Sequence, residues 1–147
     1  MRIHIGNDHR GYELKRRARL WLTEHGHEVI DHGADTTESC DYPDYAFAVA
    51  RAVAAHPGDL GVVICGSGIG VSMAANKVPG VRAALCMTPA MAAQSRRHND
   101  ANVLALGADN LPDEENLRIL ETWLAASFEG GRHQCRVEKL GRGEAVR

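Results

Sequence analysis

Short apolar runs alternate with stretches of helical spacing along this sequence. The runs cover residues 2–5, 28–30, 60–65, 81–86 and 102–106, and each is short enough for one buried strand. After the first run, Leu14, Ala18 and Leu22 recur at the spacing of one helix face, and Gly26 stands where a helix cap belongs. Further helices are expected over residues 41–56, 66–77, 88–98, 112–124 and 132–140.

This alternation restricts the fold to repeated strand–helix–strand units. Their right-handed crossovers generate a parallel sheet with helices on both faces. We therefore expect an α/β protein, a three-layer α/β/α sandwich around a five-stranded parallel sheet. The 147 residues are room for a single domain over residues 1–147, with residues 141–147 as a loose tail.

Charge and cysteine content exclude several classes of protein. The 17 Lys and Arg residues against 19 Asp and Glu leave a net charge of -2, which gives no long-range attraction to nucleic acid or an anionic membrane. The four cysteines show no C-x-x-C spacing, so neither a zinc finger nor a dense disulfide framework is expected. The N-terminus lacks the apolar segment of a signal peptide, and no run approaches the ~18 residues of a membrane span. We expect a cytoplasmic protein with neither nucleic acid nor membrane as a partner.

A glycine-rich turn follows the third run, at the sheet edge where parallel α/β proteins bind ligands. Gly66, Gly68 and Gly70 follow a strand and open a helix, an arrangement that presents backbone N–H groups to an oxyanion or phosphate. The spacing fails the G-x-G-x-x-G dinucleotide pattern, and no P-loop lysine follows. The alternative is a tight turn with no ligand.

Cys65 stands directly before this turn. A thiol beside backbone amides and a helix N-terminus is favoured as the thiolate, which can act as a base or nucleophile. The alternative is a small buried apolar residue at the end of a strand.

Other polar candidates follow further elements. Asp8 and His9 come directly after the first run, where a carboxylate and an imidazole can orient substrate hydroxyls or a phosphate. His98 ends a predicted helix and is a candidate acid or base, a helix cap or a surface residue. Arg132 and Arg136 stand at i and i+4, so they form either a phosphate clamp on one helix face or a solvated basic face.

Metal binding is not expected from the histidine spacing. His9, His98 and His133 are far apart in the sequence and form no H-x-H or H-x-x-x-H pattern.

The candidate residues together fit one type of reaction. A thiol base, amides for an oxyanion, a histidine acid and an arginine pair fit proton abstraction next to a carbonyl in a phosphorylated substrate.

Five segments in order carry a resemblance to a known family. They are Asn7 to Lys15, Asp41 to Ala46, Val62 to Lys77, Ser95 to Asn102 and Glu129 to His133. Over nearly the whole chain the sequence resembles the ribose-5-phosphate isomerase B group, which also contains galactose- and allose-6-phosphate isomerases. The resemblance implies a metal-independent aldose–ketose isomerase with no cofactor and a Rossmann-like fold. It also implies a homodimer or dimer of dimers whose active sites use residues from two chains, with a sugar phosphate as the small-molecule partner.

The resemblance also implies roles for individual residues. Cys65 would move a proton between C1 and C2, the amides of Gly66, Gly68, Ile69 and Gly70 would stabilise the enediolate, and Ser67 would orient the substrate or base. His98 would assist ring opening, Asp8 and Asn99 would hold hydroxyls, and His9, Arg132 and Arg136 would bind the phosphate. Val71 stands where one branch of the family has a glutamate base, so the chain resembles the cysteine branch.

One position departs from the family pattern. Asp109 stands where ribose-phosphate members usually have an arginine, which replaces a phosphate-binding cation by an anion at a substrate-binding position. Arg10, at a position usually small or apolar, is expected to restore the charge from the other side of the pocket. The substrate alternatives to ribose 5-phosphate are a hexose 6-phosphate and a tetrose 4-phosphate.

Two hypotheses from other functional classes remain alternatives. A non-catalytic phosphate- or nucleotide-binding module would use the same sheet edge but would not need a thiol base. Nucleic-acid binding through the basic first and last helices is disfavoured, because aromatic residues are not interleaved and the net charge is negative.

Overall fold

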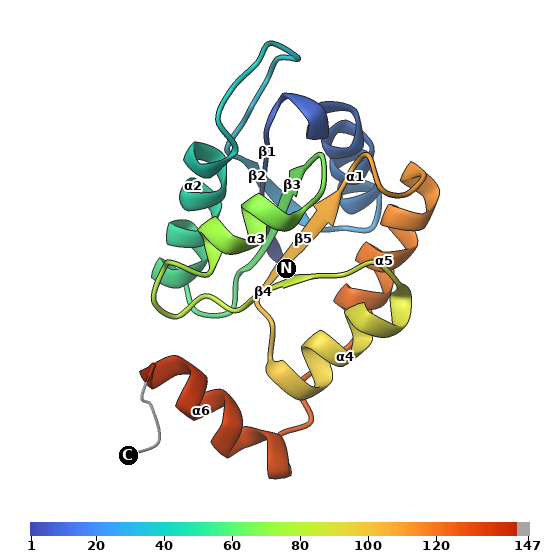
Figure 1. Ribbon diagram of the computed structural model, residues 1–147. Helices are drawn as coiled ribbons and strands as arrows, with labels where there is room; N and C mark the ends of the chain where they lie inside the picture. The colour runs from blue at the N-terminus through green and yellow to red at the C-terminus, as the bar shows by residue number, and fades with distance from the viewer. Residues whose placement is uncertain (144–147) are drawn as a thin grey trace.

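The computed structural model describes residues 1–143 and contains one five-stranded parallel sheet with the strand order β2-β1-β3-β5-β4 (Figure 1). The strands are β1 (Arg2–Asn7), β2 (Glu28–Asp31), β3 (Leu60–Cys65), β4 (Ala83–Leu85) and β5 (Val103–Gly107). The helices are α1 (Tyr12–Glu24), α2 (Tyr42–Ala55), α3 (Ile69–Ala75), α4 (Pro89–Asn99), α5 (Asp113–Ala125) and α6 (Gln134–Arg142). Two 3₁₀ turns, η1 (His9–Gly11) and η2 (Gly131–His133), precede α1 and α6.

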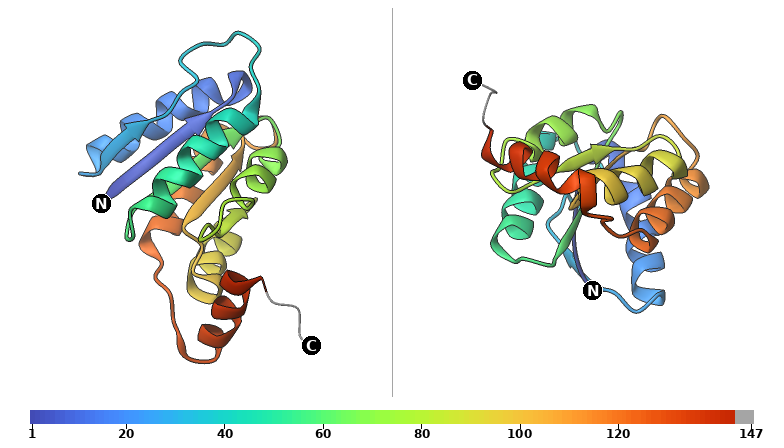
Figure 2. Two further views of the ribbon diagram at one scale, coloured as in Figure 1. Left: turned by 90° about the vertical axis from the view of Figure 1, so that its left-hand side faces the viewer. Right: turned by 90° about the horizontal axis from the view of Figure 1, so that it is seen from below.

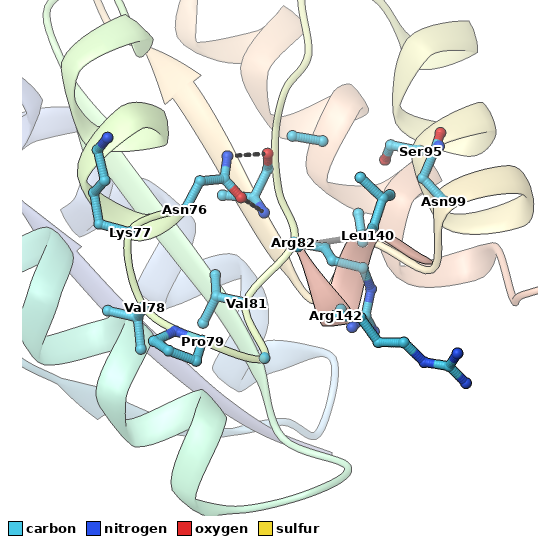
Figure 3. Close-up of a pocket in the computed structure, with 16 residues that line it drawn as sticks. Asn76, Lys77, Val78, Pro79, Val81, Arg82, Ser95, Asn99, Leu140 and Arg142 are labelled. Carbon is cyan, nitrogen blue, oxygen red and sulfur yellow. Dashed lines mark hydrogen bonds between the residues drawn. The ribbon is translucent and has the colours of Figure 1, made fainter. Parts of the chain in front are cut away.

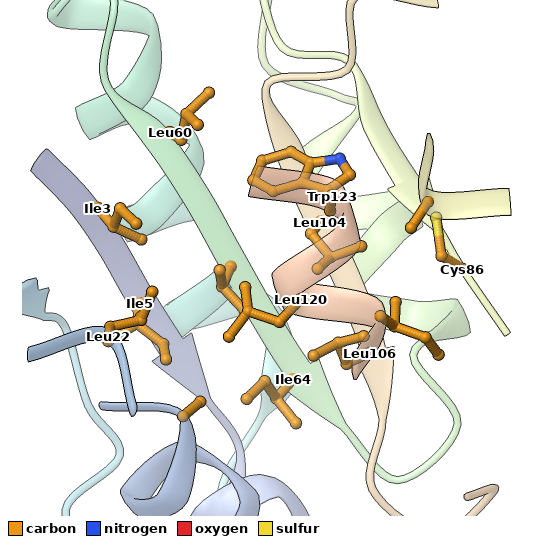
Figure 4. Packing of buried hydrophobic residues seen from close by; sticks show 14 of the residues in the cluster. Ile3, Ile5, Leu22, Leu60, Ile64, Cys86, Leu104, Leu106, Leu120 and Trp123 are labelled. Atoms are coloured by element: carbon orange, nitrogen blue, oxygen red, sulfur yellow. The ribbon is translucent and has the colours of Figure 1, made fainter. Parts of the chain in front are cut away.

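Apolar side chains leave the central strands on alternate faces and form two cores. One core joins the side of the sheet that includes Ile64 and Leu106 to α1, α4 and α5, with Trp123 fully buried in it (Figure 4). The other joins the opposite face, including Val63 and Ala105, to α2 and α3. Because side chains alternate along a strand, helices on both faces require strands that are apolar throughout, as β3 is. The predicted three-layer α/β/α sandwich with a parallel sheet is confirmed.

The edge strand β4 is shorter than the predicted run of residues 81–86. The side chain of Asn76 accepts from the Ala83 amide at 2.8 Å and donates to the Ala83 carbonyl at 2.9 Å. One residue earlier, the Arg82 amide donates to Asn102 Oδ1 at 2.8 Å. Side-chain amides therefore satisfy the backbone where a longer strand would need a further neighbour.

The C-terminal segment differs from its prediction at both ends. Arg132 lies in η2, so the last helix begins two residues later than predicted, at Gln134. The expected loose tail from residue 141 is wrong at its start, because Gly141 and Arg142 form the last turn of α6 and Gly143 caps it with a φ of 60°. Residues 144–147 of that tail lie outside the described residues. Figures 1 and 2 show α6 beside α4 at one end of the molecule.

None of the helices in residues 1–143 combines the length and the apolar character that a membrane crossing needs.

Candidate active site

The turn after β3 places a thiol and backbone amides together. Cys65 is the last residue of β3 and is 5% exposed. The Gly68 N–H donates to the Cys65 sulfur at 3.1 Å. Gly68 has a φ of 76°, and a Cβ at this position would lie 2.5 Å from Leu85 Cδ1 and 2.9 Å from the carbonyl carbon of Leu106. Only glycine can follow this path without strain, so it fixes an amide against the sulfur.

The next residues of the loop are held by short contacts. Ser67 Oγ accepts a hydrogen bond from the Ile69 amide at 3.2 Å, and the Ser67 carbonyl accepts from Asn110 Nδ2 at 2.9 Å. A Cβ on Gly70 would lie 2.6 Å from the Tyr42 ring, so that ring lies directly against the loop. The Gly68 and Ile69 amides, for which the resemblance implies a contact with the enediolate, thus have hydrogen-bond partners within the loop.

Asp8 and His9 lie beside this loop at the end of β1, where the Asp8 amide donates to the Ile64 carbonyl at 3.1 Å. Asp8 is 5% exposed, and its Oδ1 accepts from the amides of Arg10 at 2.9 Å and Gly11 at 3.2 Å. It therefore caps η1, a role that was not predicted from the sequence. His9 Nδ1 accepts from the Cys40 amide at 3.3 Å, which leaves Nε2 to carry the proton of a neutral ring.

Arg10 and Asp109 form an ion pair over the glycine loop, with 2.5 Å between Nε and Oδ2. A Cβ on Gly66 would lie 2.6 Å from that Asp109 oxygen and 3.0 Å from Arg10 Nε, so the pair covers Gly66 directly. The hydrogen bond that Arg10 donates to the Asp109 carboxylate is the main reason that the pKa of Arg10 is raised. Arg10 follows β1 and Asp109 follows β5, so the two side chains come from opposite sides of the β3 loop and meet over Gly66.

The remaining candidates lie at the other end of the sheet. Cys65 pairs with Gly107 at the end of β5, whereas α4 ends at Asn99, just before β5 begins at Val103. Five residues of β5 separate the two ends by roughly 13 Å. Within one chain, therefore, His98 and Asn99 lie away from the Cys65 loop.

Arg132 and Arg136 lie with His98 rather than with Cys65. The His98 ring stacks on the His133 ring with centroids 4.4 Å apart, and the Glu129 amide donates to the Arg97 carbonyl at 3.0 Å. The predicted single helix face for the two arginines is wrong in detail, since Arg132 belongs to η2 and Arg136 to α6. Both side chains are exposed at this second location.

A groove of about 790 Å³ lies beside these residues, between α6 and the segment from Asn76 to Ala84 (Figure 3). Asn99 lines it from α4 and Leu140 from α6. Leu140 is among the exposed large apolar residues of the chain, together with Ile69 and Met73 on α3. Apolar surface is thus exposed both beside the Cys65 loop and beside the His98 group.

One group of side chains here has donors that a metal could use. Single ligand atoms of His98, Glu129 and His133 lie within 4.8 Å of one another. The two imidazoles, however, are stacked with only 14° between their planes. In closely stacked rings the nitrogen lone pairs lie in nearly parallel planes, whereas an ion needs them to meet at one point, so this geometry does not fit a metal.

The chain is similar in sequence to proteins of a known family. Residues 3–140 match the family described as ribose/galactose isomerase. The chain belongs to the ribose/galactose isomerase family. Ribose-5-phosphate isomerase B of Escherichia coli (strain K12) is 49% identical over 139 residues, which are 95% of this chain and 93% of that protein. The predicted family is therefore confirmed.

Solved members of the ribose/galactose isomerase family have the same fold. Ribose-5-phosphate isomerase B of Clostridium thermocellum is 54% identical with a TM-score of 0.95, over 97% of this chain and 96% of that one. The Mycoplasma genitalium enzyme, solved with bound ribulose-5-phosphate, is 45% identical with a TM-score of 0.94, over 97% and 95%. The relatives are isomerases, which confirms the predicted enzyme class.

Three contacts at the site were not predicted from the sequence. They are the Tyr42 ring against Gly70, the Asn110 side chain on the Ser67 carbonyl and the Cys40 amide on His9. Asn110 follows a predicted strand end, which is a usable signal. Tyr42 and Cys40 precede or begin a helix elsewhere in the chain, and no local pattern connects them with the loop.

Proposed function

We propose that this chain interconverts ribose 5-phosphate and ribulose 5-phosphate through a cis-enediol, with Cys65 as the base. The contact between the Cys65 sulfur and the Gly68 amide carries the proposal. An N–H that donates to sulfur holds the sulfur in one position, here at the strand end where parallel α/β proteins bind ligands. The bound ribulose-5-phosphate in the Mycoplasma genitalium relative supports this substrate class.

The proposed reaction moves two protons and leaves the sugar composition unchanged. The Cys65 thiolate removes the proton from C2 of the open-chain aldose, while the carbonyl oxygen on C1 takes a proton from water. The cis-enediol then returns the proton of its C2 hydroxyl to water, and C1 takes the proton held by the Cys65 thiol. Negative charge on the oxygens during these steps would be stabilised by the backbone amides of Gly66 and Gly70, while those of Gly68 and Ile69 hold Cys65 and Ser67, so the mechanism requires neither metal nor cofactor.

Ser67 and His9 have supporting roles in this proposal. The Ser67 hydroxyl accepts from the Ile69 amide, which orients it beside Cys65 in the loop. His9 presents Nε2 while Cys40 fixes its Nδ1, so the ring is oriented to donate to a phosphate oxygen. Asp8 would hold a substrate hydroxyl while its Oδ1 caps η1.

We further propose that a second copy of the chain completes the site as a homodimer or a dimer of dimers. His98 would assist ring opening, Asn99 would hold a hydroxyl, and Arg132 and Arg136 would bind the phosphate, all from the partner chain. Two observations support this proposal: these residues lie at the end of β5 opposite Cys65, and the exposed Ile69, Met73 and Leu140 give apolar surface that an interface would bury.

The Arg10–Asp109 pair favours a second candidate, an isomerase of a hexose 6-phosphate or a tetrose 4-phosphate. A carboxylate at the edge of the loop disfavours a phosphate there and changes the length of substrate that fits.

For the location of the reaction we propose the cytoplasm, because the four cysteines are free thiols, as a reducing compartment would keep them.

The test is turnover of a panel of sugar phosphates by the tag-free protein with a chelator present. The panel contains ribose 5-phosphate, allose 6-phosphate, galactose 6-phosphate and erythrose 4-phosphate. We expect ribose 5-phosphate to be preferred, and Cys65→Ser to lower its kcat by about 10²–10⁴-fold. Cys135→Ser, at an exposed thiol, is the matched control and should retain turnover.

Each other result has a distinct meaning. Preference for another sugar phosphate would support the second candidate. Full turnover by Cys65→Ser would exclude the proposed base. No turnover of any sugar would favour the phosphate-binding module.

A further inference from the structure

Three histidines and an aspartate form a cluster outside the proposed active site. His4 lies in β1 between Ile3 and Ile5, whose side chains enter the core under α1 and α5, so its own side chain lies on the α2 face. His56 caps α2, and Asp59 precedes β3. His4 is 3% exposed, with its Nε2 3.0 Å from Asp59 Oδ2 and its Nδ1 3.0 Å from His32 Nε2.

The donor atoms of this cluster lie close together. Single ligand atoms of His4, His56 and Asp59 lie within 4.8 Å of one another. The rings of His4 and His56 are stacked more loosely than those of His98 and His133, with centroids 6.1 Å apart and 28° between their planes. A Zn²⁺ ion holds nitrogen and oxygen at about 2.0–2.2 Å, which places tetrahedral ligands roughly 3.3 Å apart. His4 Nε2 and Asp59 Oδ2 are 3.0 Å apart, slightly closer than that spacing, and His56 is exposed.

Second contacts orient the two imidazoles for this purpose. His56 Nδ1 lies 2.9 Å from the Ala52 carbonyl and must carry a proton to bond to it, so the lone pair of a neutral ring is on Nε2. Without an ion, His4 Nε2 donates to Asp59 Oδ2, because a carboxylate oxygen can only accept. An ion bound between these two atoms would replace that proton, and His4 Nδ1 could then carry the proton and donate to His32 Nε2.

The charges near the cluster are compatible with a cation. Asp59 supplies a negative charge, and Arg2 Nη1 lies 3.8 Å from its Oδ2. Arg2 also lies 3.3 Å from Glu28 and is partly exposed, so it can stay with Glu28 when an ion takes the carboxylate. Two imidazoles and one carboxylate, with a water in the open position, are a donor set that Zn²⁺ commonly takes.

We propose that His4, His56 and Asp59 bind a divalent transition-metal ion, with Zn²⁺ as the best match, and that the ion ties the end of α2 to β1 and β3. Such an ion would be structural, because the cluster does not include the Cys65 loop. The competing explanation is a network of hydrogen bonds with no ion. The two differ in whether the folded chain takes up zinc at these residues.

The test is calorimetric titration of the tag-free full chain with ZnCl₂, together with thermal unfolding with and without the metal. His56→Ala removes one ligand at an exposed position, and Asp59→Asn removes the charge. His25→Ala is the matched control, because His25 also ends a helix with its Nδ1 bonded to the carbonyl four residues earlier, at 2.7 Å. We expect one ion per chain and a zinc-dependent rise in Tm for the wild type and His25→Ala. In His56→Ala and Asp59→Asn, affinity should fall at least about tenfold.

Titration with Co²⁺ identifies the ligand type. Nitrogen and oxygen ligands give visible bands without the charge-transfer band of a thiolate, and we expect only the former. The proposal fails if the wild type takes up no zinc, if His56→Ala binds zinc as His25→Ala does, or if cobalt shows thiolate ligation. Should Asp59→Asn fail to fold, the exposed His56 still decides the outcome.

Discussion

At the scale of single residues, Arg10 and Asp109 place opposite charges side by side over Gly66. Each side chain therefore neutralises the other where the phosphate of a substrate would approach. If the loop binds an anion, Asp109→Asn should leave Arg10 unpaired and lower KM, whereas Arg10→Ala should leave a free carboxylate and raise KM. Because both side chains are about half exposed, we expect changes of about two- to fivefold with kcat little altered.

The double variant makes this prediction specific. Arg10→Ala with Asp109→Asn removes both charges, so its KM should return close to that of the wild type if the two residues act as a pair. Steady-state kinetics on the preferred sugar phosphate would measure all three. Changes of the same sign in both single variants would mean that the pair shapes the loop rather than its charge.

At the scale of elements, the path from β3 into α3 depends on one left-handed residue. Gly68→Ala would combine a positive φ with a Cβ at 2.5 Å from Leu85 Cδ1. The φ alone costs about 1–2 kcal/mol, and overpacking adds about 1–3 kcal/mol. We expect a loss of roughly 2–5 kcal/mol in the free energy of unfolding, measured by urea denaturation, with a fall in kcat because the Cys65 amide contact moves.

Gly26→Ala is the control for the backbone effect. Gly26 has a φ of 78° and no atom within 4 Å of the added Cβ, so it should lose only about 1–2 kcal/mol and keep its kcat. Equal losses at Gly26 and Gly68 would show that close packing does not constrain the loop.

The junction between α4 and α6 should respond to acid. Burial lowers the pKa of His133, and His98, Arg132 and Arg136 lower it further, against a smaller opposite effect of Glu129. The unfolded chain therefore binds a proton at His133 near pH 6.5, where the folded chain does not. Stability from this group is complete above that pH, is lost as the pH falls through it, and levels off below the folded pKa.

Thermal unfolding between pH 8 and pH 5 would measure this effect. Tm of the wild type should fall more steeply below pH 6.5 than Tm of His133→Gln, which cannot take up the proton. His27 and His32 also have lowered pKa values, but they act equally in both proteins. Parallel curves would mean that His133 does not contribute.

Local sequence patterns predicted an element well where its boundaries depend on neighbouring residues. The apolar strand Leu60–Cys65 and the start of α4 at Pro89 match their sequence signals, because burial and capping act between neighbouring residues. The short β4 was missed because Asn76 and Asn102 satisfy its backbone from other elements. In each such case the decisive contact joins residues that are distant in sequence.

At the scale of the whole molecule, the same reasoning separates what could be predicted at the site from what could not. Strand ends in a parallel sheet meet at one edge, so Asp8, Cys65 and Asp109 could be grouped from the sequence. Arg10 could be linked to Asp109 only because both depart from the family pattern, and the direct ion pair between them was not predicted. Histidine spacing likewise gave no hint that His4 and His56 approach each other, because only the packing of α2 on β1 brings them together.

The two separate groups of site residues give the last prediction. If one chain supplies Cys65 and its partner supplies His98, neither Cys65→Ala nor His98→Asn can form a complete site alone. A mixed dimer of the two variants, however, has one site with both native residues. Random reassortment of equal amounts of the two variants makes half of the dimers mixed. Because each mixed dimer has one intact site out of two, about one quarter of wild-type turnover should return.

The matched control mixes Cys65→Ala with the double variant Cys65→Ala/His98→Asn, which cannot form an intact site in any pairing. The chains would be exchanged by dilution in mild denaturant and dialysis, with dimer formation followed by light scattering. Recovery in the first mixture and none in the control requires a site shared between chains, because reassortment by itself occurs in both. If both mixtures stay inactive although mixed dimers form, then Cys65 and His98 do not act in one composite site, and the exposed apolar surfaces beside them need another explanation.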